Sequence, residues 1–476
     1  MASGKRASMR EGPLAALFRK TETDGLSDEP EVQSAPPRAA EPQPPEPPRE
    51  EPAAPRVPTP PRRQVDRAVP PSPPAPPPGL SAADAPIPAR RDLTLAERPQ
   101  FQPNELLVTI EGAQPDAIAG QLAQTFNLTI LESQGFALLE NRRVYRFSIP
   151  DNRPVETVVA AVGGTPGVAQ SAPNFLYYLQ GAGATGKEAL SLQYALPKLR
   201  VPDTQDLVSG RGVTVAVIDS GVDTRHPALK DADITFFDAV DGGIKDPDQH
   251  GTAITGIIAG RGEISGIAPE ARILAMRAFA PQRLGAPPST SSLALARATD
   301  TAFTKGARVF NMSFAGPRDP LLLSLIDAGN AKGAVFVAAA GNAGPSAPPA
   351  YPAAYEKVIG ITATDEDDGL YAMANRGAYV SVAAPGVDIL APVVGRSLDY
   401  MSGTSFAAAH ISGIVALLKE RNAKLEPEEV RRILLAAAHD LGAVGVDEDF
   451  GAGLADAYRA LGMAGPALGA QSSINP

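Results

Sequence analysis

Val213–Asp223, with the sequence VTVAVIDSGVD, decides the fold class of this chain of 476 residues. A continuous run of apolar and β-branched residues ends there in Asp219 and a Ser-Gly turn. Such continuous runs are typical of parallel strands that are buried on both faces of a sheet. Between segments rich in small residues, the pattern recurs at Ile273–Met276, Val309–Met312 and Ala334–Ala340. We therefore predict an α/β fold over residues 193–462, with a mostly parallel sheet and helices on both faces.

The composition excludes several kinds of function. Hydrophobic residues make up 43%, enough for a sizeable core, and 43 basic against 53 acidic residues give a net charge of −10. That charge argues against a nucleic-acid partner. The lack of cysteine excludes disulfides and a cysteine nucleophile, and leaves the redox compartment open. No run reaches the roughly 18 apolar residues of a membrane span, and Leu14–Phe18 is shorter than a signal-peptide core of about 7–15 residues.

Residues 1–100 differ in composition from the rest of the chain. Pro, Ala, Arg and Glu dominate, as in Glu41–Pro48 (EPQPPEPP) and Pro70–Pro78 (PPSPPAPPP). Proline lacks the backbone donor that helices and sheets use, and few large apolar residues are present to offset the entropy of ordering. We interpret 1–100 as a disordered, proline-rich tether with polyproline II character. A ligand for a proline-reading domain is the alternative.

Residues 101–180 show the pattern of a small α+β domain. Strand-like and helix-like segments follow in the order β-α-β-β-α-β, which is typical of a ferredoxin-like fold. The expected segments are Asn104–Glu111, Asp116–Phe126, Leu128–Glu132, Arg143–Ile149, Pro154–Val162 and Val168–Leu179. We interpret residues 181–192, which include Gly181–Gly186 (GAGATG), as a flexible linker and 463–476 as a tail. The pattern alone leaves open an independent binding domain at 101–180.

Three short motifs in the α/β region carry residues suited to chemistry. Asp219 ends a predicted buried strand, where functional groups gather in open parallel sheets. His250, in Gln249–Gly260 (QHGTAITGIIAG), precedes a helix of small residues, and Ser405 opens the apolar helix of Ser402–Leu418 (SGTSFAAAHISGIVALL). Taken singly, they could be a turn aspartate, a structural histidine and a helix cap. Their order along the chain, Asp then His then Ser, is that of subtilisin.

These motifs belong to a longer ordered set, and from about Gln193 to Leu461 the chain resembles the subtilisin-like serine peptidases. The resemblance also rests on NMSFAG (Asn311–Gly316), AAAGN (Ala338–Asn342), APG (Ala384–Gly386) and GAGLADA (Gly451–Ala457). Residues 101–180, which end in APNFLYYL (Ala172–Leu179), are similar to the inhibitory propeptide of the same family. The resemblance implies a subtilisin-like α/β fold, preceded by a ferredoxin-like propeptide, and a serine endopeptidase.

The resemblance implies roles that agree with the chemistry of these side chains. Ser405 would be the nucleophile, His250 the base that takes its proton, and Asp219 the group that orients the imidazole. The side-chain amide of Asn342 and the backbone N–H of Ser405 would form the oxyanion hole. Substrate would add as a strand along Ser313, Phe314, Ala315 and Gly316. The side-chain pocket would be lined by Ala315, Ala338, Ala339, Ala340, Gly341 and Ala350.

Departures from the family pattern carry further expectations. Ala315 and Ala350 stand where many relatives have glycine, so the pocket should disfavour the largest aromatic side chains. Residues 261–266 are shorter than the calcium-binding loop of many relatives and offer Glu263 without a run of oxygen ligands. We therefore expect no required cofactor or metal and no tight calcium site there, with a bound calcium ion as the alternative. Asp365–Asp368 is interpreted as a solvated acidic loop.

The resemblance also implies a zymogen. The propeptide would template the slowly folding parallel sheet and then inhibit the peptidase, and processing would cut between about Tyr178 and Leu190. The expected partners are protein or peptide substrates and the chain's own propeptide, with no nucleic acid. A transpeptidase and a non-catalytic peptide-binding scaffold are the alternatives. Most relatives are secreted, whereas the missing signal-peptide core leaves a cytoplasmic location as the alternative.

Overall fold

The computed structural model describes residues 100–179, 182–183, 193–240, 246–281, 286–395 and 397–465, all within the unit Ala89–Pro476. The predicted tether up to residue 99, most of the predicted linker and residues 466–476 of the predicted tail lie outside the described residues. The predicted α+β and α/β regions fall mainly inside them.

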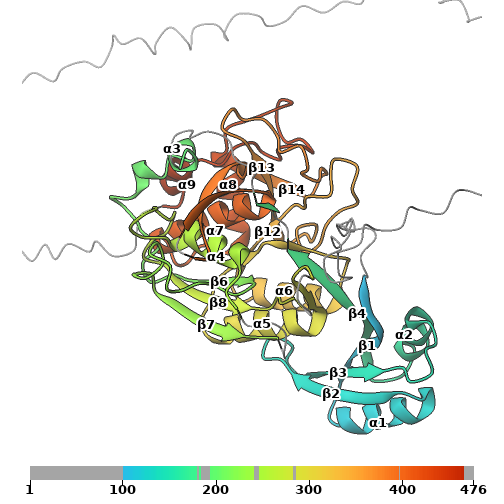
Figure 1. The fold of residues 1–476 in the computed structure, drawn as a ribbon. Coiled ribbons are helices and arrows are strands. Elements are labelled where there is room, and N and C mark those ends of the chain that lie inside the picture. The colour runs from blue at the N-terminus through green and yellow to red at the C-terminus, as the bar shows by residue number, and fades with distance from the viewer. Residues whose placement is uncertain are drawn as a thin grey trace, which may run out of the picture. The chain divides into compact units, whose positions relative to one another are not determined.

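A small α+β domain comes first in the chain (Figure 1). Its elements are β1 (Phe101–Glu111), α1 (Pro115–Phe126), β2 (Thr129–Gly135), β3 (Arg142–Ser148), α2 (Val155–Gly163) and β4 (Val168–Leu179). β1 pairs antiparallel with β3 and β4, and β3 pairs with β2, which gives the strand order β4-β1-β3-β2. The predicted ferredoxin-like order of elements is confirmed.

In the sheet of this small domain, β1 and β3 bury side chains on both faces. Leu106 and Val108 of β1 pack with α1 and α2 in the domain's own apolar cluster. Leu107 and Val144 point to the other face, because successive side chains of a strand alternate. They pack against two helices of the larger part of the chain, α5 (Ser292–Thr304) and α6 (Pro320–Asn330), through Leu293, Ala296, Leu321 and Leu325.

A seven-stranded sheet forms the centre of the larger part. Its strands are β6 (Thr214–Asp219), β7 (Ile234–Asp238), β8 (Arg272–Arg277), β10 (Val309–Met312), β12 (Val335–Ala339), β13 (Val358–Thr364) and β14 (Val380–Pro385). The order is β14-β13-β12-β10-β6-β8-β7, and every pairing between these strands is parallel. The buried apolar runs therefore form parallel strands, as predicted.

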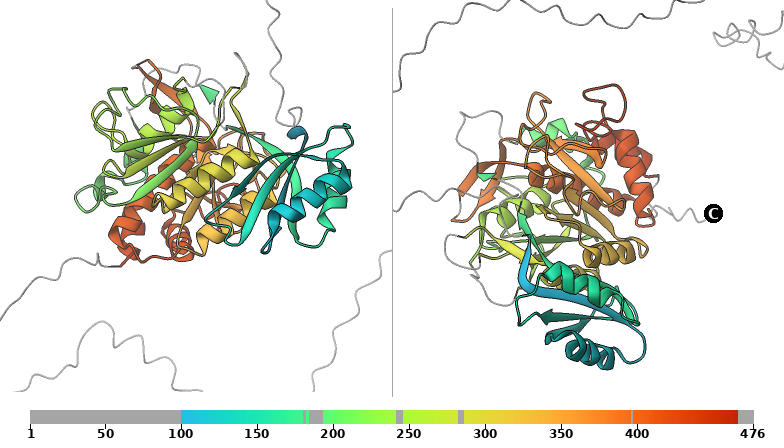
Figure 2. Two further views of the ribbon diagram at one scale, coloured as in Figure 1. Left: turned by 90° about the horizontal axis from the view of Figure 1, so that it is seen from below. Right: turned by 90° about the vertical axis from the view of Figure 1, so that its right-hand side faces the viewer.

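Helices cover both faces of this sheet (Figure 2). Val215 and Val217 of β6 join the cluster that contains α4 (Gln249–Ala259) and α7 (Thr404–Arg421), whereas Ala216 and Ile218 join the cluster with α5 and α6. The larger part also contains the helices α3 (Ala195–Lys198), α8 (Pro427–Ala437) and α9 (Ala457–Met463). The α/β fold prediction is confirmed. Among the helices that the structure describes, none has the length and apolar character to cross a membrane.

β4 links the two parts of the chain, because it runs on from the small sheet into the larger part (Figure 1). There it lies between β9 (Ser289–Ser291) and β11 (Phe314–Ala315), and pairs antiparallel with both. A separate three-stranded sheet contains β15 (Ile389–Val393), β16 (Ser397–Ser402) and β5 (Ala182–Gly183). The ends of β4 and β16 position the site described next.

Candidate active site

Asp219 is the last residue of β6, a strand that lies between β10 and β8. Its side chain is fully buried. The Ser220 backbone N–H donates to Asp219 Oδ1 at 2.7 Å, and the Ser220 hydroxyl lies 3.1 Å from the same oxygen. The turn after the strand therefore holds the carboxylate at the carboxyl edge of the sheet, where functional groups of parallel sheets gather.

His250 is the second residue of α4 and faces Asp219. Asp248 caps this helix, and its Oδ1 accepts the His250 backbone N–H at 2.9 Å. The imidazole Nδ1 lies 2.8 Å from Asp219 Oδ1 and 3.0 Å from Oδ2. An ionised carboxylate only accepts hydrogen bonds, so Nδ1 carries a proton and Nε2 of the neutral ring keeps a lone pair. The ring is buried and lies 5.7 Å from that of Phe406.

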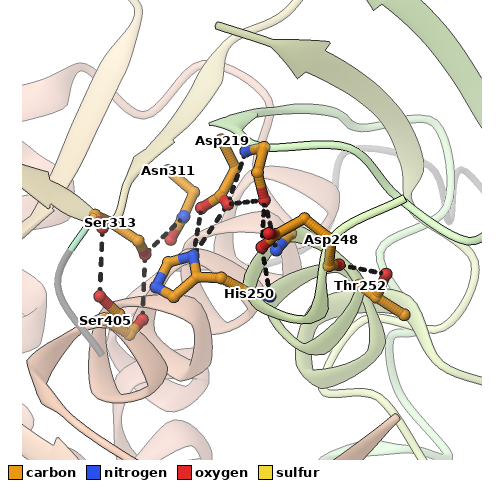
Figure 3. A network of polar contacts seen from close by, with 9 residues as sticks. Asp219, Asp248, His250, Thr252, Asn311, Ser313 and Ser405 are labelled. Atoms are coloured by element: carbon orange, nitrogen blue, oxygen red, sulfur yellow. Dashed lines mark hydrogen bonds and ion pairs between the residues drawn. The ribbon is translucent and has the colours of Figure 1, made fainter. Parts of the chain in front are cut away.

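Ser405 lies on the other side of the imidazole, in the first turn of α7 (Figure 3). Its hydroxyl donates to the Ser313 carbonyl at 3.1 Å, and the Ser313 hydroxyl donates to the Ser405 carbonyl at 3.1 Å. Asn311, in β10, donates through Nδ2 to the Ser313 hydroxyl at 2.9 Å. These bonds hold the start of α7 against the end of β10. The structure thus brings Asp219, His250 and Ser405 together from three separate elements.

Asn342 follows β12 and contacts the first residue of α7. Its Oδ1 accepts the Thr404 backbone N–H at 3.1 Å and the Thr404 hydroxyl at 2.8 Å. Because two donors meet this end of the amide, it is the oxygen, and Nδ2 is the donor end. As the second residue of the helix, Ser405 has a backbone N–H without an intrahelical acceptor, at the positive end of the helix dipole. The two predicted oxyanion donors thus lie on segments joined at Thr404.

β4 lies along the predicted substrate-binding segment. Tyr178 pairs with Ala315 and Leu179 with Phe314, and the same strand pairs on its other edge with β9. The residue before Phe314 is Ser313, whose carbonyl accepts the Ser405 hydroxyl. On the other side of Ser405, β5 pairs with β16 through Ala182 and Ser402. The chain's own strands therefore approach Ser405 from both sides.

The residues predicted to line the side-chain pocket come from three neighbouring segments. A Cβ added to Gly341 would lie 3.2 Å from that of Ala350. Tyr351, next to Ala350, pairs with Gly316, which brings Ala315 close as well. This placement does not test the preference against large aromatic side chains, which stays a prediction.

The end of β12 contributes less to that pocket than the sequence suggested. Ala338 packs in the cluster with α5 and α6, whereas Ala339 packs in the cluster with α7 on the opposite face of the sheet. The two side chains therefore do not line one wall, and on the Ala338 side only the backbone of Ala339 is available. Ala340 is fully buried, and its carbonyl accepts the Tyr379 hydroxyl at 2.9 Å.

Sequence reasoning missed the residues that position the Asp–His pair. The Ser220 hydroxyl lies 2.9 Å from Asp248 Oδ1 and accepts the Gly251 N–H at 3.1 Å. The Thr252 hydroxyl donates to the Asp248 carbonyl at 2.7 Å. An aspartate directly before a helical pattern is a capping signal, so Asp248 could have been identified from the sequence as a helix cap. The Ser220 contacts bridge two distant segments and depend on tertiary packing.

His410, a further buried histidine, has a different environment from His250. Nδ1 of His410, in α7, lies 3.0 Å from the Pro385 carbonyl, and burial lowers the pKa of this histidine to about 4. It is therefore neutral in the folded chain at neutral pH. Within the described ranges, no group of three or more His, Cys, Asp or Glu side chains is placed to hold a metal ion.

Comparisons with known proteins point to one family. The model of the subtilase family matches residues 210–453. A thermophilic serine proteinase from Bacillus sp. (strain AK1) is 37% identical over 293 residues, which are 59% of this chain and 71% of that protein. Subtilisin Savinase from Lederbergia lenta is 30% identical over 277 residues, which are 57% of this chain and 99% of that protein. Thermitase from Thermoactinomyces vulgaris is 34% identical over 235 residues, or 48% of this chain and 82% of that protein.

A solved structure extends the likeness to the fold. The crystal structure of fervidolysin from Fervidobacterium pennivorans, described as a keratinolytic enzyme related to subtilisin, matches with a TM-score of 0.66 and 25% sequence identity. The match covers 77% of this chain and 62% of that chain, so this chain spans less than two thirds of the fervidolysin structure.

Proposed function

This chain belongs to the subtilase family and is a serine endopeptidase, and we propose that it hydrolyses peptide bonds through a triad of Asp219, His250 and Ser405. The observation that carries the proposal is the 2.8 Å contact between His250 Nδ1 and Asp219 Oδ1, with Ser405 on the other side of the ring (Figure 3). A serine hydroxyl is a weak nucleophile at neutral pH and needs an adjacent base, which an oriented neutral imidazole supplies.

The proposed reaction has two halves. Ser405 Oγ adds to the substrate carbonyl carbon while its proton passes to His250 Nε2, and Asp219 stabilises the imidazolium. The resulting oxyanion accepts hydrogen bonds from the Ser405 N–H and Asn342 Nδ2. When the C–N bond breaks, His250 returns the proton to the leaving amine. A water molecule then attacks the acyl-enzyme by the same steps and releases the acid.

The Ser405 hydroxyl has to turn before it attacks. It has one proton, which it donates to the Ser313 carbonyl at 3.1 Å. Rotation about one side-chain bond would redirect that proton to His250. The same rotation would free the Ser313 carbonyl for a backbone N–H of a substrate that adds as a strand. The Ser313 carbonyl would then couple substrate binding to activation of the nucleophile.

We further propose that the small domain is an intramolecular inhibitor that the enzyme removes by processing itself. β4 reaches Ser405 along β11, and β5 pairs with β16 on the other side, so the chain approaches the nucleophile as a substrate would. These pairings support a cut between Leu179 and Ala182. That interval lies inside the wider range from Tyr178 to Leu190 expected from the sequence.

The test compares the intact mass of the purified full-length protein with that of Ser405→Ala after treatment with a fluorophosphonate. We expect the wild type to lose the residues up to the interval between Leu179 and Ala182 and to take one label. The variant should stay at 49.3 kDa without a label. A wild type that stays full length and unlabelled would contradict the proposal.

We propose that neither half of the reaction requires a metal ion or a cofactor, because every step uses a group of the chain or water. Incubation with EDTA should therefore leave the rate of fluorophosphonate labelling unchanged. A labelling rate that falls with EDTA and returns with calcium would contradict this part of the proposal.

A further inference from the structure

Tyr177 of β4 fills a pocket that the reaction itself does not use. The side chain is fully buried, and its ring packs edge-on against Phe314 with 5.8 Å between the ring centroids. Gly316 forms the floor, because a Cβ there would lie 2.3 Å from Tyr177 Cδ1. Tyr177 belongs to a buried apolar cluster that also contains Leu295 and Leu322. The pocket therefore has the size and shape of an aromatic ring.

The far end of this pocket is polar. The Tyr177 hydroxyl donates to Asp319 Oδ2 at 3.1 Å and lies 3.4 Å from the Pro317 carbonyl. The backbone N–H of Phe175 donates to Ser292 Oγ at 2.9 Å, and the Ser292 side chain is hydrogen-bonded to the Asp319 carboxyl. The side chain of Tyr177 thus contacts the Asp319 carboxyl directly, and the backbone N–H of Phe175 reaches it through Ser292.

Contacts within the larger part of the chain hold Asp319 in place. Asp319 caps α6, where its Oδ1 accepts the backbone N–H of Leu321 at 2.8 Å and that of Leu322 at 3.4 Å. The Tyr355 hydroxyl accepts the Asp319 N–H at 2.8 Å and donates to the Asp319 carbonyl at 2.8 Å. Oδ1 is thus engaged by the helix, and Oδ2 points to the Tyr177 hydroxyl. Burial raises the pKa of the Asp319 carboxyl, while the hydrogen bonds from Ser292 and the helix oppose that change.

We propose that Asp319 is a specificity-determining residue that selects tyrosine over phenylalanine at the substrate position occupied here by Tyr177. This inference rests on the proposed function, because a substrate would lie along β9 and β11 as β4 does. The position is defined by the backbone register, in which Tyr177 pairs with Thr290 of β9.

The selection follows from the cost of leaving a buried acceptor without a donor. Once β4 has left, a tyrosine ring restores the hydrogen bond to Asp319 Oδ2, whereas a phenylalanine ring fills the same volume and brings no donor to that oxygen. Sites built to hydrogen-bond a hydroxyl reject the analogue that lacks it. A hydrogen bond to a charged group corresponds to a preference of about tenfold to a hundredfold.

The experiment uses the processed enzyme and two peptides that copy residues 171–185 of the chain, SAPNFLYYLQGAGAT, with a fluorophore and a quencher at the ends. The second peptide carries Tyr177→Phe. We expect kcat/KM for the tyrosine peptide to exceed that for the phenylalanine peptide by about tenfold or more. In the enzyme variant Asp319→Asn the ratio should fall severalfold, because the amide keeps the helix cap but can bond the tyrosine hydroxyl only as a neutral partner, which is worth less than a charged acceptor.

The matched control is Asp327→Asn, which removes one carboxylate from an exposed position on the same helix and should leave the ratio as in the wild type. Equal kcat/KM for the two peptides in the wild type overturns the proposal, as does a ratio that survives Asp319→Asn. Fluorophosphonate titration reports whether each variant has a folded site, and the wild-type ratio tests the proposal even if Asp319→Asn does not fold. An enzyme that takes no label and cuts neither peptide contradicts the proposed function instead.

Discussion

Two buried carboxylates, Asp219 and Asp319, lie in two regions for which we propose different roles, proton transfer and substrate recognition. Each accepts a backbone N–H from the residues that follow it, and each is almost fully buried. Asp219 faces the imidazole of His250, a ring that can accept and return a proton. Asp319 faces the phenol of Tyr177, whose pKa burial raises well above its usual value, so that it keeps its proton. The partner of the carboxylate therefore decides whether a region suits proton transfer or recognition.

The largest expected effect separates these two regions directly. Asp219→Asn should lower kcat by about 10⁴-fold, because an amide at this place favours the wrong tautomer of the imidazole. Asp319→Asn touches no reacting atom and should change the fluorophosphonate labelling rate far less. Steady-state kinetics and labelling of both variants check this. Similar losses in the two variants would mean that the regions do not differ as the contacts indicate.

The next effect tests whether the donors at the start of α7 belong to the reaction region. Asn342→Ala should lower kcat by about 10²–10³-fold, the cost reported for loss of one oxyanion-hole donor in subtilisin, and should change KM little. The tie between Asn342 Oδ1 and Thr404 would be lost as well. Thr404→Val, which removes only the hydroxyl, is the control for that structural part. Unchanged turnover in Asn342→Ala would remove this residue from the site.

The two regions also differ in how much of each could be predicted from the sequence. Asp219, His250 and Ser405 each lie where a buried strand or an apolar helix begins or ends, so local patterns and their order identify them. Asp319 stands before Pro320 at a helix start, which by itself indicates only a cap. Its partner Tyr177 lies 142 residues away in the sequence. A contact between residues so far apart in the sequence leaves no signal in the local hydrophobic periodicity.

The strands show the same limit. In the parallel sheet, β6, β8, β10 and β12 are predicted from the sequence, because burial on both faces leaves a continuous apolar signal, whereas β7, β13 and β14 were not identified. β9 has only three residues, Ser289–Ser291, without an apolar pattern, and it was missed. β1 begins at Phe101 and not at Asn104, since pairing with β4 resumes at Phe101 beyond an irregular stretch in which Asn104 has a φ of 57°. Short or irregular pairing depends on the neighbouring strand more than on the residues themselves.

A smaller effect should come from the floor of the recognition pocket. In Gly316→Ala the new methyl group would lie 2.3 Å from Tyr177 Cδ1, so the ring must shift from the position in which its hydroxyl meets Asp319. Overpacking of this kind costs about 1–3 kcal/mol, and it would weaken the hold of the larger part on β4. After processing, the small domain should therefore dissociate more readily. Ser405 should then become accessible to the fluorophosphonate about tenfold sooner.

The control for this change is Gly462→Ala, where an added Cβ meets nothing within 4 Å. This variant should gain accessible sites at the wild-type rate. If Gly316→Ala also does so, the Tyr177 pocket contributes little to the retention of the small domain, and the recognition region would matter for substrates alone.

The smallest expected effect concerns stability and pH. Because the pKa of Asp319 is raised in the folded chain by burial, the folded state keeps its proton over a range in which the unfolded state has lost it. The stability that Asp319 contributes, relative to a variant without this group, is therefore fully present below the unfolded pKa of about 3.9. It declines as the pH rises through the raised folded value. Asp319→Asn removes the titrating group and keeps a residue that can cap α6.

Thermal unfolding of Asp319→Asn and its parent, both in the Ser405→Ala background to prevent self-cleavage, measures this difference between about pH 3 and pH 7. The Tm of the parent should fall relative to that of the variant as the pH rises. The exposed change Asp327→Asn should show no such trend. A parent that instead gains on the Asn variant would mean that the hydrogen bonds from Tyr177, Ser292 and the helix outweigh burial. Asp319 would then be held in the folded chain as a charged acceptor for the tyrosine hydroxyl.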